Sequence, residues 1–176
     1  MALIPVPDTL IVTYLEMTHR DQFRPSFVDD PRIQIVPMGR VDVGYYRFLY
    51  TGVGYDLRWR DRLVISEDEL RDILLNPNVS VHVLWMEGVP AGYVELEKQG
   101  ADTEVSFFGL RPGYQGFGYG KHLLSYGLQR AWDEGAGRVW VHTCNMDGAH
   151  ALANYLKRGF QVYKVEEQPM PDRYKT

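Results

Sequence analysis

A glycine-rich stretch between a predicted strand and a predicted helix contains the residue types that point most directly to chemistry. It reads RPGYQGFGYGK over residues 111–121. Glycines let backbone amides approach a bound anion closely, and the N-terminus of a helix favours negative charge. The stretch therefore predicts a site for a phosphate or pyrophosphate group.

Two common phosphate-binding motifs do not fit this stretch. A dinucleotide-binding fingerprint, G-x-G-x-x-G, needs a third glycine where the sequence has Lys121 or Leu123. A Walker A loop would end at Gly120 and Lys121, but it needs glycine and Ser or Thr where the sequence has Gln115 and His122. What remains is the pattern Gln-x-x-Gly-x-Gly over residues 115–120.

This pattern resembles the pyrophosphate-binding motif of the GNAT superfamily of N-acetyltransferases, [Gln/Arg]-x-x-Gly-x-[Gly/Ala], which follows the fourth strand of that family. A second motif of the family matches at Ala151, Tyr155 and the pair Gly159-Phe160. The resemblance covers residues 79–165 and implies acetyl-CoA as co-substrate, an amine as acceptor and no metal. The residues that it assigns to acetyl-CoA are Phe108, Leu110, Gln115, Gly116, Phe117, Gly118, Tyr119, Gly120 and Lys121.

Acetyl transfer to an amine needs a base for the ammonium group, a polarised thioester carbonyl and a proton for the leaving thiolate. The resemblance implies Glu104 as the base, with water and backbone carbonyls as the alternative. It implies Tyr155 as the acid, since a phenol with a pKa near ~10 can protonate a thiolate and stay neutral itself. For the carbonyl it implies a bulge over residues 107–110, eased by Gly109, with the backbone of Phe108 and Leu110 binding the substrate.

The sequence departs from the family pattern at one position. Family members often have asparagine three residues before the alanine of the second motif, where it contacts the pantetheine arm, and this sequence has Gly148. Asn145 or Asp147 could take its place, or Asp147 could cap the following helix.

Cys144, His142 and His150 raise the alternative of a cysteine nucleophile or a metal site. A catalytic cysteine needs an oriented base, and a metal site needs more ligands at known spacing. We therefore interpret the three as a partly buried free thiol and ordinary histidines near a strand end.

Aromatic residues gather in and after a predicted helix over residues 41–53, which corresponds to the acceptor region of the family. Tyr46, Tyr50 and Trp59 are the residues predicted to line an acceptor pocket, and Asp56 or Asp61 could hold a cationic amine. Packing in the core is the alternative for each aromatic side chain.

The predicted elements form a single domain over residues 1–176, with an N-terminal extension (1–40), a helical acceptor region (41–75) and a CoA-binding core (79–165). Apolar alternation predicts strands at 9–15, 33–36, 79–86, 91–96, 104–110, 138–143 and 160–165. Helical spacing predicts helices at 41–53, 66–75, 118–133 and 148–157. The order predicts an α/β (α+β) fold, a mixed and mostly antiparallel sheet flanked by helices, with an added N-terminal strand.

Composition narrows the class of protein. The 176 residues are 45% hydrophobic, carry a net charge of −4 and include one cysteine, which excludes a disulfide framework. The negative charge argues against nucleic acid as a partner, and no apolar run is long enough for a membrane span or a leader. We expect a cytoplasmic N-acetyltransferase, monomer or homodimer. The alternatives are a non-catalytic acyl-CoA-binding module of the same fold and a phosphate-binding structural domain.

Overall fold

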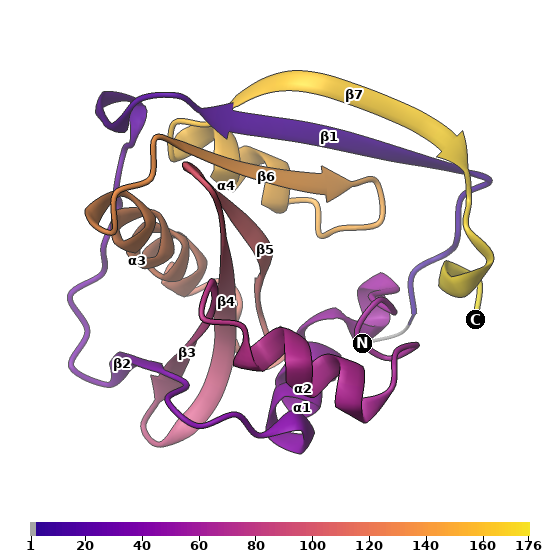
Figure 1. Ribbon diagram of the computed structural model, residues 1–176, viewed down its shortest axis with the longest axis horizontal. Helices are drawn as coiled ribbons and strands as arrows, with labels where there is room; N and C mark the ends of the chain where they lie inside the picture. The colour runs from indigo at the N-terminus through magenta and orange to yellow at the C-terminus, as the bar shows by residue number, and fades with distance from the viewer. Residues whose placement is uncertain (1–2) are drawn as a thin grey trace.

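Seven strands form one sheet in the computed structural model, which describes residues 3–176 (Figure 1). Their order in the sheet is β2-β3-β4-β5-β6-β1-β7, and only β5 and β6 run parallel to each other. The strands are β1 (Thr9–Met17), β2 (Ile33–Pro37), β3 (Val79–Met86), β4 (Val89–Gln99), β5 (Asp102–Leu110), β6 (Arg138–Cys144) and β7 (Gln161–Pro169). The predicted fold class is confirmed.

Helices cover both faces of the sheet. The helices are α1 (Val43–Gly54), α2 (Glu67–Leu75), α3 (Tyr119–Asp133) and α4 (Ala151–Lys157). Successive side chains of a strand point to opposite faces, so Val83 and Tyr93 pack under α1 and α2, whereas Leu84 and Val94 pack in the cluster under α3 and α4. Within residues 3–176, no helix is both long and apolar enough to cross a membrane.

Local sequence explains where α2 begins, whereas α3 and α4 begin without a side-chain cap. Ser66 and Glu69 form the capping box expected before α2, with bonds of 3.1 and 2.7 Å. In front of α3 stands Gly118 with a φ of 82° and no side-chain cap, which leaves the first amides of that helix open to a ligand. Helix α4 begins three residues later than predicted, because Ala151 N–H donates to the Gly148 carbonyl in a turn that precedes the helix.

The N-terminal segment forms an interior strand of the sheet. Strand β1 lies between β6 and β7 and pairs antiparallel with both (Figure 1). Among the described strands, β7 pairs with β1 alone. The outer edge of β6 is therefore closed by the segment that sequence analysis describes as an extension.

The bulge in β5 lies one residue before the predicted stretch 107–110. Leu96 pairs with Val105 and Glu95 pairs with Phe107, so Ser106 is the extra residue. Gly109 pairs with Tyr93 in regular register and is not part of the bulge. Glycine is required there because a Cβ would lie 2.5 Å from Val53 Cγ1 of α1.

Candidate active site

The site is an opening in the sheet where β5 and β6 separate. Their parallel pairing runs from Asp102/Arg138 to Val105/Val141 and goes no further. Beyond that point lies a cavity of about 620 Å³. Its lining includes Trp59 and His142 on the α1 side and Lys121 and Asn154 on the α3 and α4 side. The cavity therefore connects the two faces of the sheet through the gap between the strands.

The glycine-rich loop and the start of α3 form one end of this cavity. Gly116 and Gly118 have φ values of 87° and 82°, which residues with a side chain rarely adopt. The side-chain amide of Gln115 donates through Nε2 to the Leu110 carbonyl at 3.2 Å, which links the loop to the end of β5. With Lys121 on the first turn of α3 and the uncapped amides there, this end of the cavity suits an anion.

The free edge of β5 turns backbone groups toward the cavity. Arg111 N–H donates to the Ala91 carbonyl at 2.8 Å, and Leu110 pairs with Gly92. This pattern makes Leu110 and Gly92 a non-hydrogen-bonded pair of the β4–β5 ladder. The backbone N–H and C=O of Leu110, and by alternation those of Phe108, point away from β4 toward the space that β6 has left. The Leu110 carbonyl accepts from the Gln115 side chain, so the Leu110 N–H and the two backbone groups of Phe108 are the ones left to bind an extended amide-containing chain.

A buried arginine lines the same cavity without a partner for two of its nitrogens. Arg158 is 8% exposed, and its Nε and Nη1 atoms make no hydrogen bond to any described residue. Burial lowers the pKa of the guanidinium, although arginine stays charged at any ordinary pH. Lys121 and Lys157 also line the cavity. Arg158, Lys121 and Lys157 give the cavity three cationic side chains, the charge that the phosphates of CoA require.

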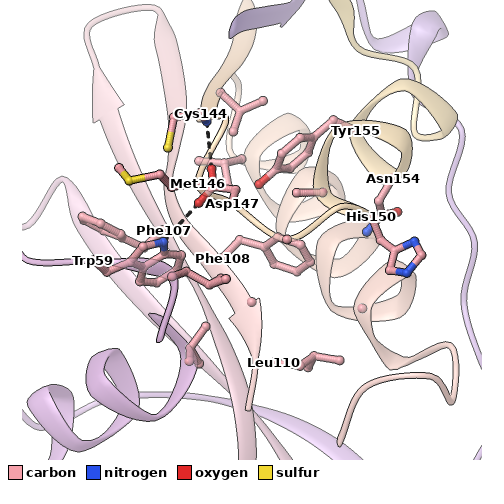
Figure 2. Close-up of a pocket in the computed structure, with 18 of the residues that line it drawn as sticks. Trp59, Phe107, Phe108, Leu110, Cys144, Met146, Asp147, His150, Asn154 and Tyr155 are labelled. Atoms are coloured by element: carbon pink, nitrogen blue, oxygen red, sulfur yellow. Dashed lines mark hydrogen bonds between the residues drawn. The ribbon is translucent and has the colours of Figure 1, made fainter. Parts of the chain in front are cut away.

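Tyr155 lies where the cavity crosses the sheet. Its ring packs against Phe108 and Phe160, with centroid separations of 6.1 and 5.9 Å. Figure 2 shows its hydroxyl directed toward the space between Asp147 and Phe108. No hydrogen bond joins this hydroxyl to another described residue. Burial raises the pKa of Tyr155 far above that of a free phenol, so it enters any reaction protonated.

Asp147 fixes the loop that follows β6. Its carboxylate accepts from Thr143 Oγ1 at 2.6 Å. It also accepts from Cys144 N–H at 3.0 Å and from Trp59 Nε1 at 3.2 Å (Figure 2). It does not cap α4, whose N-cap residue is His150. Of the two possible substitutes for the missing asparagine at Gly148, Asp147 lines the cavity.

Asn145 is engaged elsewhere. Its side chain accepts from Ile11 N–H and donates to the Thr9 carbonyl, which joins it to β1. It is not one of the residues that line the cavity.

The predicted base, Glu104, lies one layer behind the cavity wall. It is 9% exposed and lies 3.4 Å from His142 Nδ1, and of the two only His142 lines the cavity. Cys144 also lines the cavity, but burial raises the pKa of its thiol to about 12. A thiol with that pKa is not ionised near neutral pH, in agreement with our interpretation of Cys144 as a non-nucleophilic residue.

The aromatic residues predicted for the acceptor divide into two groups. Trp59 lines the cavity and packs against Phe107 with its ring tilted by 58°, at a centroid distance of 5.4 Å. Tyr46 and Tyr50 have no exposed surface and belong to the core under α1, so contact with an acceptor would require α1 to move. Asp61 lines the cavity and is held by Arg173 at 2.8 Å.

Two residues of the glycine-rich loop also stand outside the cavity lining. Phe117 is 62% exposed, and the Tyr119 side chain packs in the core and donates to Asp30. Their side chains therefore do not line the site, although the Tyr119 amide opens α3. Arg158 was not identified from the sequence, where it resembles an ordinary cation at a helix C-terminus. Within residues 3–176, no group of three or more His, Cys, Asp or Glu side chains could hold a metal ion.

Comparison with known proteins identifies the family through a family model. The model of the acetyltransferase (GNAT) family matches residues 47–160. An uncharacterized N-acetyltransferase of Mycobacterium tuberculosis (strain ATCC 25618 / H37Rv) is 31% identical over 99 residues, which are 56% of this chain and 63% of that protein. The alignment thus spans less than two thirds of the relative's length.

Solved structures share the fold at low sequence identity. A GCN5-related N-acetyltransferase from Kribbella flavida has a TM-score of 0.64 and 16% identity, covering 92% of this chain and 58% of its own. An aminoglycoside acetyltransferase from an uncultured soil metagenomic sample has a TM-score of 0.61 and 18% identity, covering 73% of this chain and 88% of its own. The family match over residues 47–160 spans more than half of the chain, and it includes the parts of β5 and β6 where the two strands separate. The chain belongs to the GNAT family of acetyltransferases.

Proposed function

We propose that this protein transfers an acetyl group from acetyl-CoA to a primary amine of a small molecule or peptide, by direct attack while both substrates are bound. One observation carries the proposal: a single cavity passes through the sheet at the separation of β5 and β6. The side with the anion-binding loop suits acetyl-CoA, and the α1 side is left for the acceptor. The thioester and the amine then meet between the strands without a covalent enzyme intermediate.

Acetyl-CoA is held mainly by backbone and cationic groups in this proposal. The loop glycines and the first amides of α3 receive the pyrophosphate, and Arg158 and Lys121 pair with phosphate oxygens. The outward-facing backbone groups of Phe108 and Leu110 extend β5 along the pantetheine arm and donate to the thioester carbonyl.

Tyr155 serves the leaving thiolate. Its hydroxyl faces the cavity and has no partner among the described residues, so it can donate a hydrogen bond to sulfur. The raised pKa of the phenol makes complete proton transfer to sulfur unfavourable in isolation. Proton transfer from the phenol to sulfur leaves no phenolate behind when the nitrogen loses its second proton in the same step, because that proton goes to the phenol oxygen.

The acceptor end favours a cationic amine with an apolar flank. Trp59, Phe107 and Met146 supply apolar surface (Figure 2), and Asp61 supplies a carboxylate. The aminoglycoside acetyltransferase among the similar structures acts on one class of amine, but at 18% identity the likeness concerns the fold. The acceptor we propose is therefore a primary amine of no narrower class.

The test begins with thermal unfolding in the presence of acetyl-CoA, with ATP and NAD as controls. Saturation at a hundred times the dissociation constant adds about 2.7 kcal/mol of stability, a shift of several degrees. Release of free CoA thiol is then measured with a panel of primary amines. Amine-dependent release supports the transferase. A shift without release on any amine favours a non-catalytic acyl-CoA-binding module, and no shift contradicts both.

A further inference from the structure

We infer that His142 accepts the proton of the acceptor ammonium, and that Glu104 acts through His142 as a positioning residue. The inference rests on the proposed acetyl transfer and names the residue that activates the amine. Its basis is a chain of side chains on the α1 side of the sheet, which ends at the cavity in an imidazole.

His142 is the first residue of β6 beyond the last parallel pair, Val105 and Val141. It therefore stands at the point where the strands part. Its side chain is 46% exposed and lines the cavity, on the face opposite to Val141, which packs under α3. An amine that enters from the α1 side meets this imidazole before it reaches the thioester.

The carboxylate behind His142 is fully engaged. Glu104 Oε1 lies 3.4 Å from His142 Nδ1, and Glu104 Oε2 accepts from Gln99 Nε2 at 2.8 Å. Gln99 Oε1 in turn accepts from Trp140 Nε1 at 3.1 Å. The chain Trp140–Gln99–Glu104 thus fixes the carboxylate and directs a proton on Nδ1 toward it. That tautomer leaves the lone pair of Nε2 for the amine.

Aromatic neighbours restrain the imidazole ring. Tyr14 of β1 pairs with His142 in register, with a centroid distance of 5.7 Å. Trp140 lies two residues earlier on β6 and stacks at 6.0 Å, with 30° between the ring planes. A ring held by neighbours on two strands loses little further rotational freedom when it meets its substrate.

The surrounding charges favour a stronger base. The hydrogen bond to Glu104 raises the pKa of His142, burial opposes this, and the charges of Asp147 and Asp61 raise it further. Tyr14, on the β1 side, has a raised pKa and stays neutral. A histidine pKa moved upward toward that of the ammonium makes the proton transfer less unfavourable.

The chemistry balances with the groups present. The ammonium gives one proton to His142 Nε2, and the amine lone pair attacks the thioester carbon, forming the C–N bond. The C–S bond then breaks, and the thiolate takes the hydroxyl proton of Tyr155. The second nitrogen proton restores that hydroxyl, and the imidazolium releases its proton to solvent. The products are the amide, free CoA thiol and one proton.

The variants His142→Gln, Glu104→Gln and their combination test the inference. His19→Gln is the matched control, because His19 Nδ1 lies at the same 3.4 Å from Asp21 on an exposed turn. We expect kcat to fall roughly 10²-fold or more in His142→Gln, within the range for loss of a general base. Glu104→Gln should lower kcat less, and the double variant should be no slower than His142→Gln.

Two pH measurements separate a positioning role from a structural one. In the substrate-free protein, nitrogen NMR of the imidazole should give a His142 pKa above 6.5, which falls in Glu104→Gln. The acidic limb of kcat/KM should move to lower pH in Glu104→Gln, and it should vanish in His142→Gln. His19→Gln should change none of these quantities.

Each other result overturns the inference. If His142→Gln keeps its activity within threefold while Glu104→Gln is inactive, Glu104 is the base itself. If the His142 pKa is unchanged in Glu104→Gln, the two groups are not coupled. Absence of amine-dependent turnover in the wild-type protein defeats the proposed function and this inference with it, whereas the preceding two results leave the proposed function standing.

Discussion

Replacement of Arg158 by methionine should stabilise the free protein and weaken its binding of acetyl-CoA. Arg158 is 8% exposed, and two of its nitrogens have no hydrogen-bond partner among the described residues. Each buried donor without a partner costs about 1–3 kcal/mol. Methionine keeps the apolar stem and removes both donors, so a gain of about 1–2 kcal/mol in unfolding free energy is expected after allowance for imperfect packing. For a chain of this length that is a rise of roughly 2–8 °C in Tm.

The same substitution removes a charged partner of the CoA phosphates. A hydrogen bond to a charged group contributes about 1.5–3 kcal/mol, so one lost bond weakens binding by about 10- to 100-fold. Thermal unfolding without ligand gives the first quantity, and isothermal titration with acetyl-CoA gives the second. Lys175→Met is the control, because that lysine lies at the surface and pairs with Asp172 away from the cavity.

One result would refute this reasoning. If Arg158→Met lowers Tm and leaves acetyl-CoA affinity unchanged, the guanidinium supports the packing of α4 and has no part in binding. A rise in Tm together with a loss of acetyl-CoA affinity is the result expected if Arg158 destabilises the free protein and binds the ligand.

Three further predictions concern the site and the fold. Tyr155→Phe should lower kcat at least tenfold with unchanged acetyl-CoA affinity, measured by steady-state kinetics and titration; equal kcat would remove Tyr155 from the reaction. Gly159→Ala should destabilise the protein by more than about 2 kcal/mol in urea unfolding, because φ is 108° and the new Cβ would lie 1.8 Å from the Gln22 carbonyl oxygen. Gly39→Ala, where no atom lies within 4 Å of the new Cβ, should be nearly neutral, and similar losses in both variants would contradict the steric argument. Burial lowers the pKa of His82 to about 4. Since the unfolded chain binds this proton below pH ~6.5 and the native protein does not, stability should fall as pH drops from 6.5 to 4, by about 3 kcal/mol in all. His82→Leu should lose this part of the pH dependence, and an unchanged pH profile would rule His82 out as its source.

Much of the fold could be predicted because local signals agreed with tertiary packing. The Ser66–Glu69 capping box placed the start of α2, and the second family motif placed Tyr155 on α4. The glycine-rich loop was predicted to lie between a strand and a helix, and it does, with positive φ at Gly116 and Gly118.

The features that sequence reasoning missed depend on contacts between distant segments. Nothing near Arg158 in the sequence indicates its burial, and a segment far away in the sequence lies against its backbone, where Arg24 N–H donates to the Arg158 carbonyl. The acceptor role predicted for Tyr46 and Tyr50 rested on their position in the acceptor region of the family, but helical spacing cannot tell a core-facing stripe from a pocket wall. The site roles of Glu104 and Tyr155 stay predictions until the variants are measured.

The position of β1 has a consequence for how the protein reaches its native state. Ile11 of β1 bonds to Asn145, 134 positions along the chain, so the strand emerges early in synthesis and waits for partners that emerge late. Pairings of such long range close large loops and slow folding. Until they form, β6 keeps an unpaired edge, and open edges of this kind recruit other chains. Because Leu10 and Val12 of β1 line the cavity, one of its walls depends on this long-range pairing, and a ligand bound in the cavity stabilises the paired state of β1 and β6.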